Sequence, residues 1–138
     1  MGTWKKAAAL TVVGLLLPIL ALSQQYPMQD GNAIFVTRDA LTTGVVDREP
    51  IDDASNLPPA VGELYYFTEV KGANDSTYIT HVWYYEGREM AQVPLSVNGP
   101  RWRTWSTKQM MDNWRGSWKV EAVDSDGNIL SSQNFDLR

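Results

Sequence analysis

Alternation of apolar and polar residues with a period of two runs through most of this chain. It is clearest in Ile79–Ser106, where four apolar residues alternate with polar residues or proline: Ala91, Val93, Leu95 and Val97. Such alternation is typical of a β-strand with one face on a core and one face in water. The turn signals Glu86-Gly87 and Asn98-Gly99 bound this strand. The region therefore predicts an antiparallel meander with the aromatic segment Tyr78–Tyr85 as its central strand.

The same pattern predicts strands on both sides of this region. They are Ala33–Leu41, Val45–Val46, Leu64–Val70, Thr77–Tyr85, Arg88–Val97, Trp102–Thr107, Ser117–Val123 and Ile129–Leu137. Lys108–Arg115 is the only segment that fits a helical turn or a long loop. Asp47–Pro59 carries four acidic residues and three prolines and is expected to be a surface loop. Seven or eight short strands without alternating helices predict an all-β fold, an antiparallel, immunoglobulin-like β-sandwich, with a small barrel as the alternative.

The N-terminus has a different pattern. Lys5 and Lys6 precede an apolar run from Ala7 to Leu22, and small residues end it before Gln24. A basic start, an apolar middle and a small-residue exit predict a secretory signal peptide over residues 1–23. A retained membrane anchor over residues 4–23 is the alternative, although the run is short for a span. Residues 24–32 are expected to form a linker and residues 33–138 the β-sandwich domain.

Both interpretations of the N-terminus place the domain outside the cytoplasm, in the periplasm, because the lysines stay on the cytoplasmic side. The domain would be soluble after cleavage, or tethered to the inner membrane by the uncleaved helix. Removing Lys5 and Lys6 leaves ten of the twelve basic residues against sixteen acidic ones, a net charge near −6. A nucleic-acid partner is not expected of such a domain, and neither is binding to an anionic membrane surface except through residues 4–23.

Catalytic and metal chemistry have few candidate residues. The chain has no cysteine and a single histidine, His81. A catalytic triad or a zinc site needs partners for that histidine that no motif supplies, so we expect His81 to be a core residue beside Trp83. Asp124–Asn128 resembles the start of a calcium loop, but its glycine is misplaced and no distant acid follows. An Asp-Gly hairpin turn explains that segment, so no catalytic residue, metal or cofactor is predicted.

Tryptophans and arginines gather in the last third of the chain. Trp102 and Trp105 are three positions apart in the sequence. Because this spacing is odd, their side chains must point to opposite faces of a strand. We expect Trp118 to join the core and Trp105 to lie on the outer face. The predicted partner-binding residues are Arg101, Arg103, Trp105, Trp114 and Arg115. A protein partner, a glycan, or arginine side chains folded over tryptophan within the domain would each explain them.

Several segments in this order resemble one known family. They are Arg48-Glu49-Pro50, Tyr65–Thr68, His81–Tyr85, Arg101–Ser106, Gly116–Val120 and Asp126-Gly127 followed by Phe135. Together they resemble the bacterial domain-of-unknown-function family 2914 over about residues 33–138. The resemblance implies an exported, all-β domain with no catalytic residues to carry over, often attached to other modules or to a membrane segment.

These observations lead to one functional prediction and one alternative. The prediction is a non-catalytic periplasmic interaction or structural module, an accessory subunit of an envelope or membrane protein complex. The alternative is a module that binds glycan or peptidoglycan through surface tryptophans such as Trp105 and Trp114.

Overall fold

The computed structural model describes residues 33–55 and 62–138, together with Gly2 and Gly14. The predicted leader, apart from these two glycines, the predicted linker and the last part of the predicted loop Asp47–Pro59 lie outside the described residues. Within the described part, no helix is long and apolar enough to cross a membrane.

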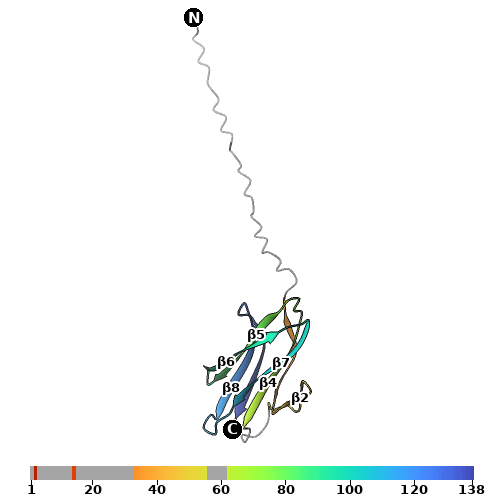
Figure 1. Cartoon of the computed structure of the whole chain (residues 1–138). Coiled ribbons are helices and arrows are strands. Elements are labelled where there is room, and N and C mark those ends of the chain that lie inside the picture. Colours follow the sequence, from red (N-terminus) through yellow and green to blue (C-terminus); the bar gives the residue numbers. More distant parts are fainter. Residues whose placement is uncertain (1, 3–13, 15–32, 56–61) are drawn as a thin grey trace.

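The described part of the chain is all-β, and every strand pairing in it is antiparallel (Figure 1). Its strands are β1 (Phe35–Thr42), β2 (Val45–Val46), β3 (Glu49–Pro50), β4 (Glu63–Lys71), β5 (Thr77–Tyr85), β6 (Arg88–Val97), β7 (Arg101–Gln109), β8 (Gly116–Asp124) and β9 (Ile129–Leu137). The predicted bounds of β5, β6 and β9 agree with the structure. The predicted β7 is three residues too short.

The segment Lys108–Arg115 was expected to be a helical turn or a long loop, and it is a loop apart from its first two residues, which continue β7. One prediction was wrong: the predicted meander breaks at Asn98-Gly99, because β6 and β7 do not pair with each other. Instead the chain crosses there from one sheet to another.

The strands form two large sheets and one small hairpin. A three-stranded sheet has the order β1-β4-β7, and a four-stranded sheet has the order β6-β5-β8-β9. The hairpin consists of β2 and β3, and its two turn residues, Asp47 and Arg48, both have positive φ angles of 52° and 61°. Glu86 and Gly87 in the β5–β6 turn have positive φ as well. Both turns thus have the left-handed pair of residues that type I′ hairpins need.

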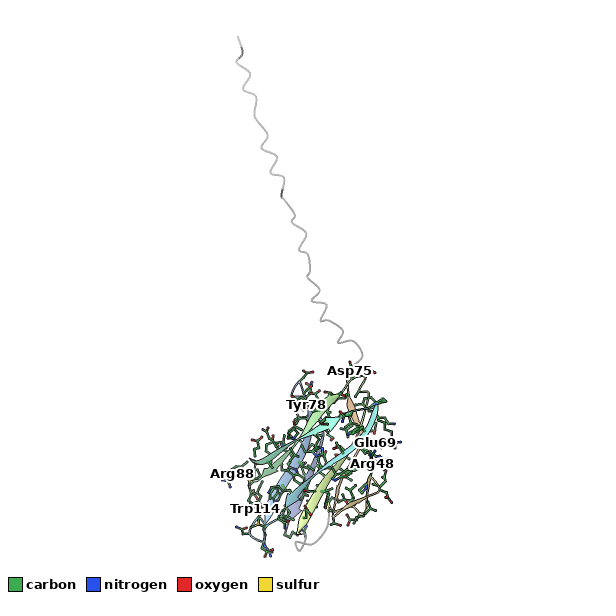
Figure 2. The ribbon with its side chains drawn as sticks, in the orientation of Figure 1. Arg48, Glu69, Asp75, Tyr78, Arg88 and Trp114 are labelled. Carbon is green, nitrogen blue, oxygen red and sulfur yellow. The ribbon has the colours of Figure 1, made fainter. Side chains whose placement is uncertain are left out.

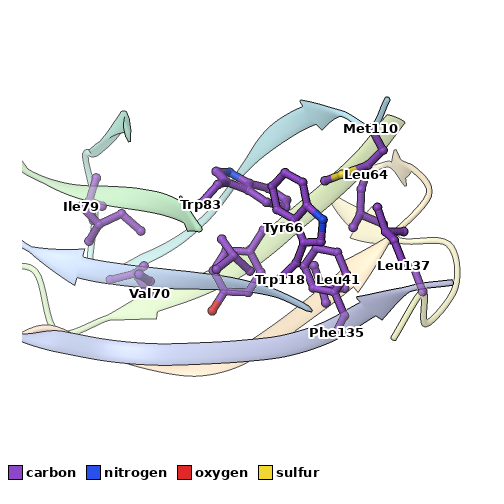
Figure 3. Close-up of a cluster of buried hydrophobic side chains, with 14 of the residues drawn as sticks. Leu41, Leu64, Tyr66, Val70, Ile79, Trp83, Met110, Trp118, Phe135 and Leu137 are labelled. Carbon is purple, nitrogen blue, oxygen red and sulfur yellow. The ribbon is translucent and has the colours of Figure 1, made fainter. Parts of the chain in front are cut away.

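One apolar cluster draws side chains from both large sheets (Figure 3). Trp83 of β5 lies near Tyr66 of β4 and Phe135 of β9, with ring centres 6.4 Å away in each case. Trp118 of β8 stacks on Phe135 at 6.0 Å. Trp83 is fully buried and Trp118 is 2 % exposed, so two of the residues expected in the core lie there. Aromatic contacts therefore join the inner faces of the two sheets, within a cluster that is otherwise aliphatic.

Candidate functional site

Strand β7 presents two different faces. Ser106 points inward, where its Oγ is hydrogen-bonded to His81 and accepts from the Trp83 indole at 3.1 Å. Trp102 also packs against the inner cluster. Because side chains alternate along a strand, Arg103 and Trp105 lie on the outer face of the β1-β4-β7 sheet. Trp105 is partly buried there.

Ion pairs fasten the β2–β3 hairpin across this outer face. Glu49 of β3 accepts from Arg38 of β1 and from Arg103 of β7, each at 2.7 Å. β1 and β7 lie on either side of β4 in the sheet. The single carboxylate of Glu49 therefore links the two edge strands of this sheet. The hydrogen bond from Arg103, followed by that from Arg38, holds the pKa of Glu49 below its usual value.

A second carboxylate extends the same network. Glu69 of β4 accepts from Arg101 at 3.0 Å, and Arg38 lies 3.8 Å from it. Hydrogen bonding from Arg101 keeps the pKa of Glu69 low despite the opposing effect of desolvation. Arg101 and Arg103 are thus engaged in ion pairs within the domain. The cation–π contacts of the described residues involve Arg38, Lys108 and Lys119 instead, so these two arginines are not folded over tryptophan as one of the sequence-based explanations had it.

The outer face also buries an aromatic ring. Phe67 of β4 is fully buried although it does not belong to the cluster between the sheets. The Arg38 guanidinium lies 5.1 Å from its ring centre, and Trp105 is its cross-strand neighbour on β7. Such cross-strand aromatic pairs and cation–π contacts each contribute on the order of 1 kcal/mol.

An open hollow of about 400 Å³ lies along β7. It is lined by Arg48, Ser96, Trp102, Arg103, Thr104 and Trp105. Four of these residues are consecutive in β7, and both tryptophans contribute to the wall. Arg48 projects from the tip of the β2–β3 hairpin, and its guanidinium forms no ion pair within the described residues. No carboxylate lines this hollow, and Arg103 is paired with Glu49, so the uncompensated positive charge at its wall is that of Arg48.

The predicted partner-binding residues are not all together. Trp114 and Arg115 lie in the loop after β7, whereas Arg101 begins that strand. Nine residues of strand at about 3.3 Å each separate these two ends. Trp114 packs beside Trp118 at 5.8 Å, and the Lys108 ammonium lies 4.5 Å from its ring. Figure 2 shows Trp114 well away from Arg48 and Glu69. Only Arg103 and Trp105 of the predicted set line the hollow.

Sequence reasoning missed Arg48, Ser96 and the contribution of Trp102 to the hollow. Arg48 was assigned to a surface loop because Asp47–Pro59 carries four acidic residues and three prolines. The hairpin gives little signal, because Asp47-Arg48 lacks the glycine that usually marks a two-residue turn. Trp102 was expected to face only the core. A signal was available in the odd spacing of Trp102 and Trp105, because side chains on opposite faces of an edge strand can border the same groove.

His81 lies in a closed polar network between the sheets. Its Nδ1 is 2.7 Å from Ser106 Oγ, and its Nε2 is 3.1 Å from Thr68 Oγ1. Thr68 donates its own proton to the Thr104 carbonyl, so His81 Nε2 must be the donor to Thr68. Nδ1 then accepts from Ser106. The ring is fully buried, and burial lowers the pKa of His81 to about 3, so the ring is neutral.

The segment Asp124–Asn128 forms a self-contained turn. One carboxylate oxygen of Asp124 accepts from the backbone amides of Asp126 and Asn128 at 3.0 and 2.8 Å. Its second oxygen accepts from the Asn128 side chain. A neighbouring hollow of about 220 Å³ includes Asp75, Asp124 and Asp126. Even so, no cluster of three acidic or histidine side chains suited to a metal ion exists among the described residues.

A comparison with known families identifies the second part of the domain. Residues 76–137 match the model of the family described as "Protein of unknown function (DUF2914)". No curated protein matches the chain. The match begins at the residue before β5 and ends with β9, so Arg48 and Phe67 precede it. The resemblance inferred from the sequence is confirmed over this range: the segment from β5 to β9 matches this family of unknown function.

Proposed function

We propose that this chain is a non-catalytic interaction module outside the cytoplasm and that it binds a protein partner through the hollow along β7. In this proposal it serves as an accessory subunit of an envelope or membrane assembly. The observation that carries the proposal is the lining of the hollow, in which Trp102 and Trp105 lie beside Arg48 and Arg103.

The finer fold in this proposal is an immunoglobulin-like β-sandwich. The four-stranded order β6-β5-β8-β9 corresponds to strands C′-C-F-G of such a fold, and β1-β4-β7 corresponds to A-B-E. The apolar cluster shared by both sheets supports the same assignment. Domains of this architecture often serve as binding modules, and this analogy rests on fold alone.

The residue types of the hollow favour a protein surface. Tryptophan and arginine are the residue types most enriched at interface hot spots. Arg48 is exposed and lacks an ion pair within the described residues, so a partner can satisfy its charge without breaking an existing contact. It is also held at a positive φ angle of 61°, and left-handed backbone at a non-glycine residue is enriched at binding sites.

A non-catalytic role is supported by the state of the one histidine. His81 is neutral, fully buried and hydrogen-bonded on both ring nitrogens. A general base must reach the proton that it abstracts, and this ring has no access to solvent. The extracytoplasmic address is supported by the basic and apolar pattern of residues 1–23.

A glycan is the second candidate ligand. Two indole rings border one hollow, and the hydroxyl groups of Ser96 and Thr104 lie beside them. Apolar sugar faces stack on indole, and hydroxyl groups can bind sugar oxygens. Soluble peptidoglycan fragments and a glycan array therefore belong in the same set of experiments as protein partners.

The test uses Trp105→Ala and Arg48→Glu in the full-length chain, expressed in its native membranes. Ile129→Ala and Arg88→Glu are the matched controls. Both residues are exposed, Ile129 begins β9 at the sheet edge opposite β6, and Figure 2 places Arg88 across the domain from Arg48. We expect the two hollow variants to fold normally and to lose a cross-linked protein partner that both controls retain. Retention of every partner by the hollow variants would contradict the proposal, and selective loss of glycan binding would favour the second candidate.

A further inference from the structure

We propose that the free edge of β7 accepts an acidic, extended polypeptide segment as an added strand of the β1-β4-β7 sheet. This inference rests on the proposed function and adds to it the mode of binding and the chemistry of the partner.

The first argument is the regularity of the β7 edge. β7 pairs with β4 without a bulge, from Lys71 opposite Arg101 to Glu63 opposite Gln109. Among the described strands, no other pairs with β7. Every second residue of β7 therefore directs its backbone N–H and C=O away from β4. A long edge of this kind, without proline, is a template for another strand.

The other edges of the two sheets are less suited to an added strand. β6 carries Pro94 opposite Thr80, and proline cannot donate a backbone hydrogen bond. β1 and β9 are linked to each other, because Gln133 donates to Asp39 at 3.2 Å. A register shift near Thr37 also interrupts the pairing of β1 with β4.

The second argument is the shape of the hollow. Its wall includes four consecutive β7 residues, Trp102 to Trp105. Two of them point toward the inner cluster and two toward the outer face. A strand laid along this edge alternates its own side chains in the same way. One set would meet Trp102 and Ser96, and the other would meet Arg103, Trp105 and Arg48, as in strand-addition complexes.

The third argument is charge. Arg48 and Arg103 line the hollow and no carboxylate does, in a chain whose net charge is −4. Acidic side chains on the outward face of an added strand would pair with Arg48. A second copy of β7 is a poor occupant, because the strand Arg101–Gln109 carries Arg101, Arg103 and Lys108 but no acidic side chain that could pair with Arg48.

The probe is a capped nine-residue peptide in which glutamate and valine alternate, titrated into the full-length chain. One control peptide replaces glutamate with glutamine. Two others carry N-methyl groups on alternate residues, one on the odd positions and one on the even positions. Because only one set of peptide amides faces β7 in a strand pair, methylation of one set should weaken binding at least tenfold and methylation of the other set should not.

Hydrogen exchange of the protein supplies the independent readout. Bound glutamate–valine peptide should slow the exchange of every second amide in β7, and the glutamine peptide should bind about tenfold more weakly. Arg48→Glu should weaken binding by a similar factor, whereas Arg88→Glu should not. Equal binding of both methylated peptides, or unchanged exchange in β7 with bound peptide, would overturn the added strand.

The two proposals fail separately. If the glutamate–valine peptide does not bind at millimolar concentration but a native partner depends on Trp105, strand addition is wrong and the hollow remains a protein-binding site. If binding of the peptide and binding of native partners are both unaffected by substitution of Trp105 and Arg48, both proposals are wrong.

Discussion

The interior between the two sheets and the outer face of the β1-β4-β7 sheet both bury an aromatic ring completely, but by different means. Trp83 is buried among other rings and a closed hydrogen-bond network. Phe67 is buried on a sheet face where Arg38 lies over it and Glu49 links β1 to β7. The interior depends on packing, whereas the outer face depends on partly exposed ion pairs.

This difference has a functional consequence. Close-packed interiors tolerate little change in volume, while partly exposed ion pairs are weak and screened by salt. The outer face is therefore the part of the domain that can rearrange around a partner at low cost. The hollow along β7 lies at its border, where Arg103 belongs both to the ion-pair network and to the wall of the hollow.

The largest expected effect is in the interior. Trp83→Ala should lower the free energy of unfolding by about 3–5 kcal/mol, because it removes a fully buried large side chain. Tyr78→Ala is the control on the same strand, since Tyr78 is 48 % exposed and surface changes stay within about 0.5 kcal/mol. Urea unfolding measures both. Equal stability of the two variants would refute the description of the interior as the packed region.

The second prediction concerns acid. The folded pKa of His81 is about 3, whereas an unfolded histidine titrates near 6.5. The unfolded chain thus binds a proton that the folded chain does not, and stability falls as pH drops from about 6.5 toward 3. The slope contributed by one such group is at most about 1.4 kcal/mol per pH unit.

The control for the acid prediction is His81→Gln. This variant should be less stable at pH 7, but its free energy of unfolding should change less between pH 6.5 and 4.5 than that of the wild type. Paired carboxylates such as Glu49 and Glu69 have lowered pKa values, so their contribution is lost only at more acidic pH. If His81→Gln shows the same dependence of unfolding free energy on pH as the wild type, a group other than His81 is responsible for it.

The third prediction addresses the outer face. Glu49→Gln should loosen the β2–β3 hairpin while the core stays intact, because it removes the charge that joins Arg38 to Arg103. Hydrogen exchange should accelerate at Ile51, whose amide donates to Gly44, and high salt should have the same effect on the wild type. Asp75→Asn is the control. Cooperative loss of the whole fold would contradict the separation of the two regions.

The charge reversal Arg103→Glu is a less specific probe of the hollow than a substitution of Arg48. It would place a second carboxylate against Glu49 and disturb the hairpin as well as the hollow. The variant Arg48→Glu separates these two effects, because Arg48 lines the hollow and forms no ion pair in the described part of the chain.

The smallest effect on stability is expected at the hairpin tip. Arg48→Gly relieves a left-handed non-glycine backbone but gives the unfolded chain more freedom. These contributions oppose each other, so the net change should stay within about 1 kcal/mol, while partner binding should weaken. Thermal unfolding and binding measured on the same sample test this. A larger loss of stability would show that the Arg48 side chain has a structural role.

Much of the fold could be predicted because strand formation leaves a local pattern. The alternation around Val93 placed β6 correctly, and the aromatic segment around Trp83 placed β5. Trp118 could be assigned to the core because Val120 and Ala122 share its face, and all three are buried. These assignments require only the two-residue period of a strand and the preference of large apolar side chains for burial.

The candidate site was less predictable. Trp105 was correctly assigned to the outer face from its odd spacing to Trp102. Trp114 and Arg115 were grouped with it because they are close in sequence, yet β7 continues to Gln109 and carries them to its far end. The sequence contains no local signal for the strand length that separates them.

The sequence by itself determined which segments are strands, which of their faces are apolar and where most turns lie, because these properties depend on neighbours only a few residues away. Only the tertiary structure decided that β7 pairs with β4 and not with β6, and that Glu49 reaches both Arg38 and Arg103. Any two alternating strands are compatible partners by pattern alone. The choice among them depends on side-chain fit across both sheets at once, and that choice brings Arg48 beside Trp105.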